Sequence, residues 1–224
     1  MRAFMVVRSR YAEDQLAMAV ANGVRQYVVL GAGLDTFAYR NPFRQVRVFE
    51  VDHPATQAWK RERLTAAGIA IPTELALVAV DFEKQKLDVE LEAAGFRSAE
   101  PAFFSWLGVT PYLTREAFEG TARFIAAMPA GSGVAFDFAV ERSALNFMER
   151  MALDELSRRV ASAGEPFQLF FAPHTLAEDL KRMGFSQVEL LDRDEINARY
   201  FADRSDKLHV RGGLGQLVSA HRII

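Results

Sequence analysis

The chain has no cysteine among its 224 residues. This absence excludes disulfide bonds, thiolate metal sites and a cysteine nucleophile. Histidine is scarce, and His53, His174, His209 and His221 are too scattered to predict a metal site. The formal net charge of -2 creates no strong field, so we expect neither nucleic acid nor a membrane as a partner.

No apolar run is long enough to cross a membrane. The first ten residues do not resemble a signal peptide, because Arg2, Arg8 and Arg10 interrupt their apolar clusters. No repeat or low-complexity linker divides the chain, and its length suits one α/β domain. We therefore expect a single domain over residues 1–224, located in the cytoplasm.

Apolar β-branched runs alternate with segments of helical spacing, which predicts a parallel sheet with helices on both faces. The expected strands are residues 26–30, 45–51, 75–80, 101–106, 133–140, 187–191 and 214–220. The expected helices are residues 11–21, 54–67, 84–94, 114–128, 143–163 and 174–183. No clear helix separates the last two strands, and two strands joined in this way can pair antiparallel.

The strongest local signal is a glycine turn, Gly31-Ala32-Gly33-Leu34-Asp35, directly after the first expected strand. Glycine has no Cβ, so a ligand can lie against the backbone, and amides of a helix expected to start here can donate to it. Asp52, 19 positions after Gly33, ends the second strand within Glu50-Val51-Asp52-His53. A carboxylate at this position can accept both ribose hydroxyls of a nucleoside.

Dinucleotide-binding folds share these two features, but their fingerprint has a third glycine three residues after the second. Thr36 occupies that position, and a predicted helix precedes the first strand. Both observations disfavour an NAD-linked oxidoreductase, which remains the alternative enzyme. At the end of the third strand, Asp81 can accept the adenine amino group and Phe82 can pack on the purine.

Together these segments resemble the leucine carboxyl methyltransferase family, especially its bacterial branch of S-adenosyl-L-methionine (SAM)-dependent methyltransferases. The segments that carry the resemblance are residues 8–14, 30–40, 49–54, 80–82 and 112–113. The resemblance implies a Rossmann-like class I methyltransferase, with a seven-stranded, mostly parallel sheet and an antiparallel final strand. It also implies SAM as the cofactor and O-methylation of a small-molecule or carboxylate acceptor.

The resemblance also implies roles for individual residues. Arg8 or Arg10 would pair with the methionine carboxylate of SAM, since a guanidinium fork binds a carboxylate bidentately. Asp52 would hold the ribose, and Asp81 and Phe82 would frame the adenine. The other residues expected around the cofactor are Gly31, Ala32, Gly33, Asp35, Glu50, His53 and Leu107.

Two features depart from the family pattern. Leu107 stands where the leucine carboxyl enzymes have a glutamate near the donor, so that contact is lost or supplied elsewhere. The chain also begins just before Arg8, whereas family members usually have a longer N-terminal region that helps to cover the site. We therefore expect a more open pocket or a lid from another chain, and a SAM-binding module without turnover remains an alternative.

Tyr112 follows the fourth expected strand, where acceptors usually bind. It could orient or deprotonate a substrate, although packing is the favoured role. The apolar run 167–171 either lines an acceptor pocket or forms a buried strand. The sequence determines neither the acceptor nor the oligomeric state.

Overall fold

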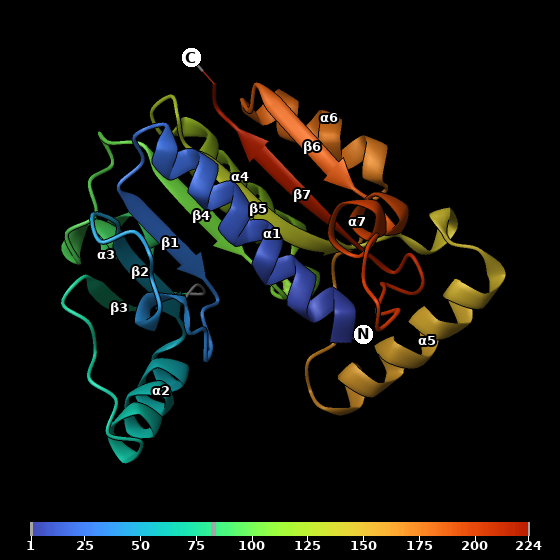
Figure 1. The fold of residues 1–224 in the computed structure, drawn as a ribbon, viewed down its shortest axis with the longest axis horizontal. Coiled ribbons are helices and arrows are strands. Elements are labelled where there is room, and N and C mark those ends of the chain that lie inside the picture. Colours follow the sequence, from blue (N-terminus) through green and yellow to red (C-terminus); the bar gives the residue numbers. More distant parts are fainter. Residues whose placement is uncertain (1, 82–83, 224) are drawn as a thin grey trace.

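A computed structural model of the chain describes residues 2–81 and 84–223. These residues form a 7-stranded sheet in the order β3-β2-β1-β4-β5-β7-β6 (Figure 1). The strands are β1 (Gln26–Leu30), β2 (Arg47–Asp52), β3 (Leu75–Ala79), β4 (Ala102–Trp106), β5 (Gly133–Ala139), β6 (Gln187–Leu191) and β7 (Gly215–His221). Strands β1 to β5 pair in parallel, whereas β7 runs antiparallel to β5 and β6. The predicted fold class is therefore confirmed.

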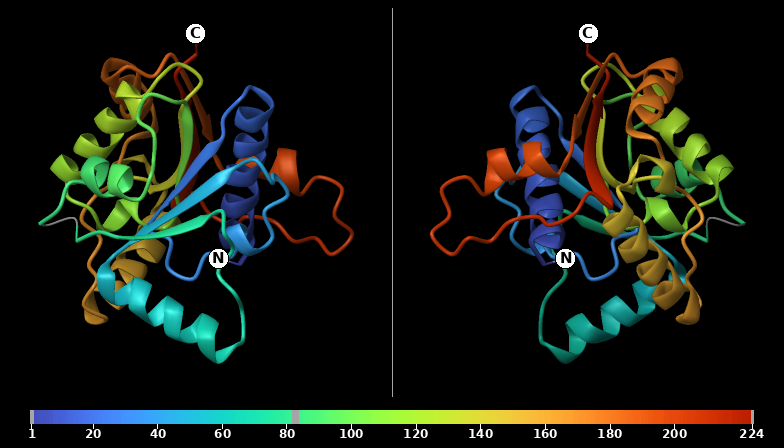
Figure 2. Two further views of the ribbon diagram at one scale, coloured as in Figure 1. Left: turned by 90° about the vertical axis from the view of Figure 1, so that its left-hand side faces the viewer. Right: turned by 90° about the vertical axis from the view of Figure 1, so that its right-hand side faces the viewer.

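Helices cover both faces of this sheet. They are α1 (Arg2–Ala21), α2 (Pro54–Ala66), α3 (Leu87–Ala93), α4 (Arg115–Ala127), α5 (Phe147–Ser162), α6 (Pro173–Met183) and α7 (Arg193–Tyr200). Figure 2 shows α1 and α7 on one face of the sheet, and α3, α4 and α6 on the other. Helix α2, the first residues of α1 and α5 lie near the edge at which the parallel strands end (Figure 1).

The burial of the central strands reflects the helices that cover both faces of the sheet. All residues of β1, β4 and β5 are buried, as expected for strands covered by helices on both faces. Aromatic side chains fill much of the layer between the sheet and α4. Phe118 of α4 packs on Trp106, Phe136 and Phe171, with ring centroids 5.4, 5.6 and 4.8 Å away.

One predicted helix start and one expected helix were wrong near the N-terminus. Helix α1 begins at Arg2 and not at Tyr11, since Ala3 and Val7 continue the buried stripe of the helix. No α-helix follows the glycine turn either. The chain forms only a short 3₁₀ helix, η1 (Phe37–Tyr39), before it enters β2.

Two further differences lie in the C-terminal half. Helix α7 separates β6 from β7, where no helix was predicted. It starts with a capping box in which Asp192 and Glu195 satisfy each other's backbone N–H groups, and Ile196 is its buried residue. The run 167–171 is not a regular strand, because within it only Phe171 forms a bridge, to Val140.

Candidate functional site

Asp52 and the glycine turn form one hydrogen-bonded unit at the tips of β1 and β2. The backbone N–H of Gly33 donates to Asp52 Oδ2 at 2.6 Å, and the N–H of His53 donates to Oδ1 at 2.7 Å. The N–H groups of Gly31 and Ala32 donate to the carbonyl of Val51 at 2.8 and 3.0 Å. Each carboxylate oxygen keeps a further acceptor position. Asp52 is therefore fixed beside the turn and can still accept two hydroxyl groups.

The two glycines of the turn serve different purposes. Gly31 has a φ of +67°, and a Cβ built on it would overlap Cγ2 of Val109, in the loop after β4. Gly33 has a φ of +49°, and a Cβ there would meet nothing within 4 Å. Gly31 thus lets the β4 loop approach the turn, whereas the open side where a ligand can contact the backbone is at Gly33.

This difference predicts unequal effects of alanine substitution. Gly33→Ala is expected to destabilise the fold by about 1–2 kcal/mol, the cost of a left-handed backbone conformation. Gly31→Ala adds the overlap with Val109, about 1–3 kcal/mol more. Urea unfolding of the two variants measures the difference. Val109→Ala should recover part of the loss in Gly31→Ala and none in Gly33→Ala; equal stabilities of the two single variants would contradict the assigned overlap.

A buried ion pair supports the turn from below. The Glu50 side chain is fully buried and pairs with Lys60 of α2, whose Nζ also donates to the carbonyl of Asp35 at 2.8 Å. Burial raises the pKa of the Glu50 carboxyl to about 7, although the hydrogen bond and charge of Lys60 lower it. Glu50, expected beside the cofactor, is thus buried in an ion pair beneath the turn.

The neighbours of these residues also have structural contacts. Asp35 Oδ1 accepts from the N–H of Phe37 at 2.7 Å and so starts η1. Ala32 is buried, and the exposed His53 accepts from the N–H of Ala55 through Nδ1 at 3.2 Å, which caps α2. Asp35, Ala32 and His53 therefore shape the turn and the start of α2 in this structure.

The structure distinguishes Arg8 from Arg10, the two arginines of α1 that were expected beside the cofactor. Arg8 points toward the sheet, where Nη1 donates to Asp137 Oδ2 at 3.1 Å, and its side chain is 17% exposed. Its guanidinium covers Gly108, because a Cβ on Gly108 would lie 2.7 Å from Arg8 Nη1. Arg10 instead pairs with Asp14 on the surface and is 67% exposed. Only Arg8 lies near the loop that contacts the glycine turn.

Asp137 belongs to this cluster but was missed in the sequence. Its Oδ1 accepts from the N–H of Gly108 at 2.5 Å, while Oδ2 holds Arg8. Burial raises the pKa of Asp137, and the charge of Arg8 opposes that shift. The available signal was a single carboxylate inside the otherwise apolar strand β5. A charge in such a strand needs a partner, so it marks a polar site.

The tip of β3 is only partly described. Asp81 pairs with Lys84 at 2.7 Å, and its N–H donates to Gln85 Oε1 at 2.9 Å. Phe82 lies outside the described residues. Leu107 is half-buried and packs against the apolar layer beneath α1. The strand order places Asp81 at the same sheet edge as Asp52, since β2 and β3 are parallel neighbours.

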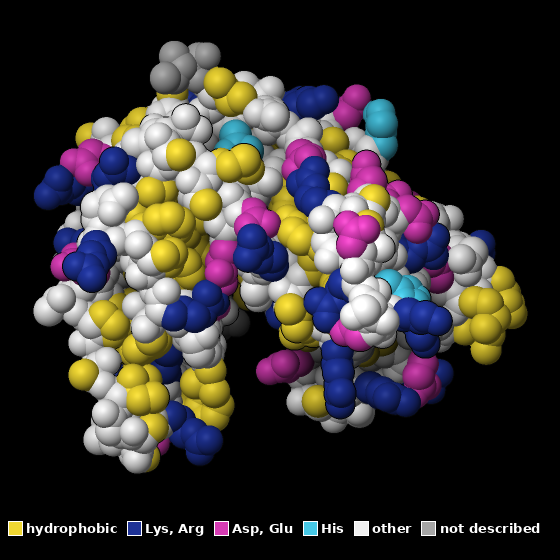
Figure 3. All heavy atoms as spheres, in the orientation of Figure 1, with side chains coloured by type: hydrophobic (Ala, Val, Ile, Leu, Met, Phe, Trp, Pro, Cys, Tyr) yellow, Lys and Arg dark blue, Asp and Glu magenta, His cyan; other side chains and the backbone are white. Residues whose placement is uncertain are grey.

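A cavity of about 400 Å³ opens beside Arg8, under α1 and α5. We call it the apolar cavity, and it is lined by Phe4, Met5, Arg8, Gly108, Pro111, Tyr112, Asp137, Phe138, Ala139, Leu153, Leu156, Val160, Phe167, Val210, Arg211, Gly212, Leu214 and Gly215. The space-filling view is hollowed at this edge of the sheet, between α2 and the part that contains the start of α1 and α5 (Figure 3). This volume falls within the range of small-molecule sites, about 300–1,000 Å³.

Tyr112 forms part of the cavity wall. Its ring lies 5.2 Å from that of Phe167, measured between centroids. Burial raises the pKa of Tyr112, with the charge of Glu165 acting in the same direction. The phenol is therefore neutral around neutral pH. It can donate a hydrogen bond to an acceptor, but it is poorly suited to remove a proton.

The remaining histidines are engaged elsewhere. His221 shares a hydrogen bond with Gln15 at 3.0 Å, and burial lowers its pKa. His209 contacts the carbonyl of Lys207 at 2.8 Å, and the exposed His174 lies 3.8 Å from Glu178.

Within residues 2–81 and 84–223, no three side chains of the metal-binding types come together. Over the same residues, no helix has the length and apolar character to span a bilayer.

Comparisons with known proteins bear on the family and the fold of the chain. A family model described as leucine carboxyl methyltransferase matches residues 1–126. YktD of Bacillus subtilis, which is named as a SAM-dependent methyltransferase, is 36% identical over 206 residues, covering 91% of this chain and 67% of YktD.

Solved structures show the same fold. A methyltransferase structure from Thermobifida fusca YX superposes with a TM-score of 0.69 at 16% identity, covering 100% of this chain and 82% of the other. Human N-acetylserotonin methyltransferase in complex with SAM gives a TM-score of 0.55 at 11% identity, covering 89% and 48%. At these identities the likeness concerns the fold alone.

Proposed function

Because the chain belongs to the leucine carboxyl methyltransferase family, we propose that it transfers the methyl group of SAM to an oxygen of a small-molecule acceptor. One observation carries the proposal: Asp52, at the end of β2, is held 2.6 Å from the N–H of Gly33 in the turn after β1. This contact presents a carboxylate and an uncovered backbone side by side, as a ribose requires.

The charges at this edge of the sheet support SAM as the ligand. Asp52 would accept the ribose hydroxyls beside the open face of Gly33, and Asp81 lies one strand further along the same edge. Arg8 would pair with the methionine carboxylate, for which its half-buried guanidinium keeps unused N–H groups. When bound, SAM supplies an electrophilic methyl group on a positively charged sulfur.

The acceptor side favours an oxygen that is already ionised. The part of the apolar cavity wall that the structure describes contains no histidine. Its one carboxylate, Asp137, holds Arg8 and Gly108, and Tyr112 is neutral. A hydroxyl acceptor would need a base, whereas a carboxylate would need only positioning and exclusion of water. We therefore place a carboxylate ahead of an alcohol as the methylated group.

Arg8 and Arg10 of α1 provide a matched test of the proposed donor site. Arg8→Lys keeps the charge beside Asp137 but removes the guanidinium fork, so SAM affinity should fall by about tenfold. Arg10→Lys, on the exposed face of the same helix, should leave the affinity unchanged. Calorimetry measures both with SAM.

Methylthioadenosine, which has the nucleoside of SAM but no amino-acid part, gives the control ligand. Its affinity should be the same in Arg8→Lys and in the parent chain. If Arg8→Lys lost the same affinity for both ligands, Arg8 would support the fold and not bind the carboxylate. If Arg10→Lys lost as much SAM affinity as Arg8→Lys, the two positions would not differ in function.

The sequence left two alternative functions open, and a different observation addresses each of them. The sheet order with its reversed β7 differs from the 3-2-1-4-5-6 order of dinucleotide folds, so nothing in the fold favours an NAD-linked oxidoreductase. A SAM-binding module without turnover would bind SAM yet transfer no methyl group to any acceptor. A transfer assay with labelled SAM and a panel of carboxylic acids distinguishes it from an enzyme.

A further inference from the structure

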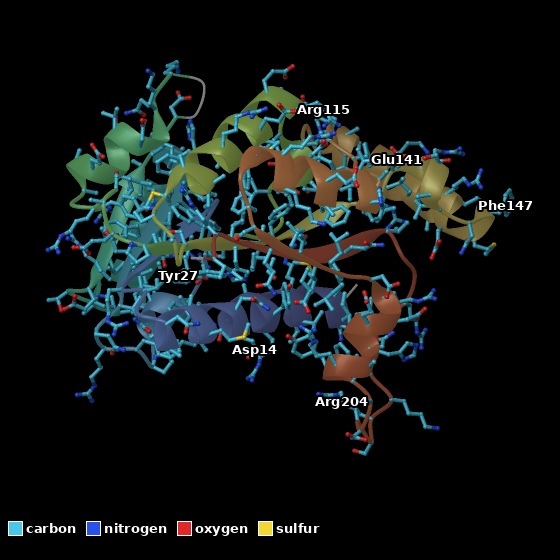
Figure 4. All side chains as sticks on the ribbon, turned by 90° about the horizontal axis from the view of Figure 1, so that it is seen from above. Asp14, Tyr27, Arg115, Glu141, Phe147 and Arg204 are labelled. Atoms are coloured by element: carbon cyan, nitrogen blue, oxygen red, sulfur yellow. The ribbon has the colours of Figure 1, made fainter. Side chains whose placement is uncertain are left out.

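The apolar cavity has walls that no donor-binding role requires. Helix α5 presents Leu153, Leu156 and Val160 to it, at the spacing of one helical face. Leu156 and Val160 are only half-buried, so they still border open space. The opposite face of α5 points away from the molecule, as Phe147 at its first position shows (Figure 4). The inner face of α5 thus forms part of the cavity wall.

The loop after β4 contacts both the cavity and the glycine turn. Gly108 lines the cavity beneath the guanidinium of Arg8, and the next residue, Val109, lies against Gly31 of the glycine turn. A molecule in the cavity therefore has its inner end near the Arg8–Asp137 pair. Oxygen and sulfur must lie on opposite sides of the methyl carbon during transfer, and this arrangement can place an acceptor there.

The lining specifies a chemical class. Apart from Arg8, Asp137, Arg211 and the Tyr112 hydroxyl, every lining side chain is apolar or is a glycine. Asp137 offsets Arg8, whereas Arg211 forms no ion pair with any residue in the part of the chain that the structure describes. The cavity thus combines an apolar body with one uncompensated positive charge. Sugars, nucleotides and polar peptides would leave buried polar groups unpaired there.

We propose that the apolar cavity is the acceptor site, and that the acceptor is a compact aryl or branched acyl compound with one carboxylate. This assignment rests on the proposed function. In the reaction a bond forms between the carboxylate oxygen and the methyl carbon while the carbon–sulfur bond breaks. The bonding pair stays on sulfur, so the products are a methyl ester and a neutral thioether, and no proton is transferred.

The test uses 4-(trifluoromethyl)benzoate as the probe and fluorine NMR of the full chain, with and without S-adenosylhomocysteine. Leu156→Trp fills the cavity and should weaken probe binding by about tenfold or more. Met151→Trp, on the outer face of α5 and 56% exposed, is the matched control and should have no effect. SAM affinity should be the same in both variants and in the parent chain.

A second variant tests the charge. Arg211→Ala should weaken the benzoate by about threefold, as expected for an exposed charge, and leave the neutral 4-(trifluoromethyl)benzyl alcohol unaffected. Equal losses for both compounds would overturn the role of Arg211. Succinate, a polar dianion of similar length, should not displace the probe.

Two results separate this inference from the proposed function. Probe binding that Leu156→Trp leaves unchanged, or that succinate competes away, would overturn the acceptor site while SAM binding persists. If instead the probe binds as expected but the parent chain binds no SAM, the proposed function fails. The cavity would then bind an apolar acid for a reason other than methyl transfer.

Discussion

Asp52→Asn is expected to weaken SAM binding by about a hundredfold or more, because two charge-assisted hydrogen bonds of about 1.5–3 kcal/mol each depend on this carboxylate. Asp52 uses one oxygen to hold Gly33 and the other to hold His53. An amide group would turn its NH₂ toward one of these N–H donors and would no longer accept both ribose hydroxyls. The substitution removes ligand contacts and loosens the turn together.

Calorimetry with SAM measures this loss, and the melting temperature reports how much of it comes from the fold. Asp206→Asn is a suitable control, since Asp206 also accepts a backbone N–H, from Leu208 at 3.1 Å, and pairs with Arg204. All three residues are exposed, and Figure 4 shows Arg204 on the loop that follows α7 and projects from the molecule. Undiminished SAM affinity in Asp52→Asn would remove Asp52 from the ribose site.

Lys60→Met is expected to be the most destabilising single change under the turn, at about 3–5 kcal/mol near pH 8. It leaves the Glu50 carboxylate buried without its cation. Glu50 Oε1 has no hydrogen-bond partner within residues 2–81 and 84–223, so nothing else in that part of the chain compensates the charge. The loss of the Asp35 contact should also weaken SAM binding.

The pKa of Glu50 determines how the destabilisation by Lys60→Met changes with pH. The folded-state pKa of Glu50 is about 7, above its ordinary value of 4.5. Between pH 4.5 and pH 7 the Glu50 carboxyl is therefore protonated in the folded state and ionised in the unfolded state. Stability from this group therefore falls as pH rises from about 4.5 to 7. Without Lys60 the folded-state pKa rises further, so the deficit of the variant should grow from pH 6 to pH 9 and shrink at pH 5.

Urea unfolding at these pH values checks both the size and the trend. The double variant Glu50→Leu with Lys60→Met replaces the pair by apolar side chains of similar size and should recover most of the stability. A double variant as unstable as Lys60→Met would mean that packing, and not an unpaired charge, is responsible. A deficit that does not change with pH would contradict the role of Glu50.

Several parts of the site were predictable because they depend on local patterns. The apolar run 26–30 followed by Gly31 indicates a buried strand and a sharp turn, and Asp52 ends the next strand. In a parallel sheet such consecutive strands end at one edge, so the meeting of Gly33 and Asp52 follows from the order of elements. The capping residues of α7 were also present in the sequence, as Asp192 and Glu195, although that helix was missed.

Other parts depended on which face of an element is buried. Arg8 and Arg10 are two residues apart on α1, so their side chains point roughly 200° apart around the helix. The sequence offers both, and only packing against β5 turns Arg8 toward Asp137. By contrast, Glu50 and Asp52 are two residues apart on β2, so they lie on the same face of the sheet and the strand period does not distinguish them. One side chain is buried over Lys60, while the other stays at the rim.

By itself the sequence determined the alternation of strands and helices, the glycine turn and the carboxylate that ends β2, because these are set by neighbours along the chain. The tertiary structure alone decided which arginine enters the site, that Asp137 holds it, and that α1, α5 and the segment before β7 enclose a cavity. These contacts join residues such as Arg8 and Asp137, 129 positions apart. No local preference encodes them, since they exist only after both faces of the sheet are covered.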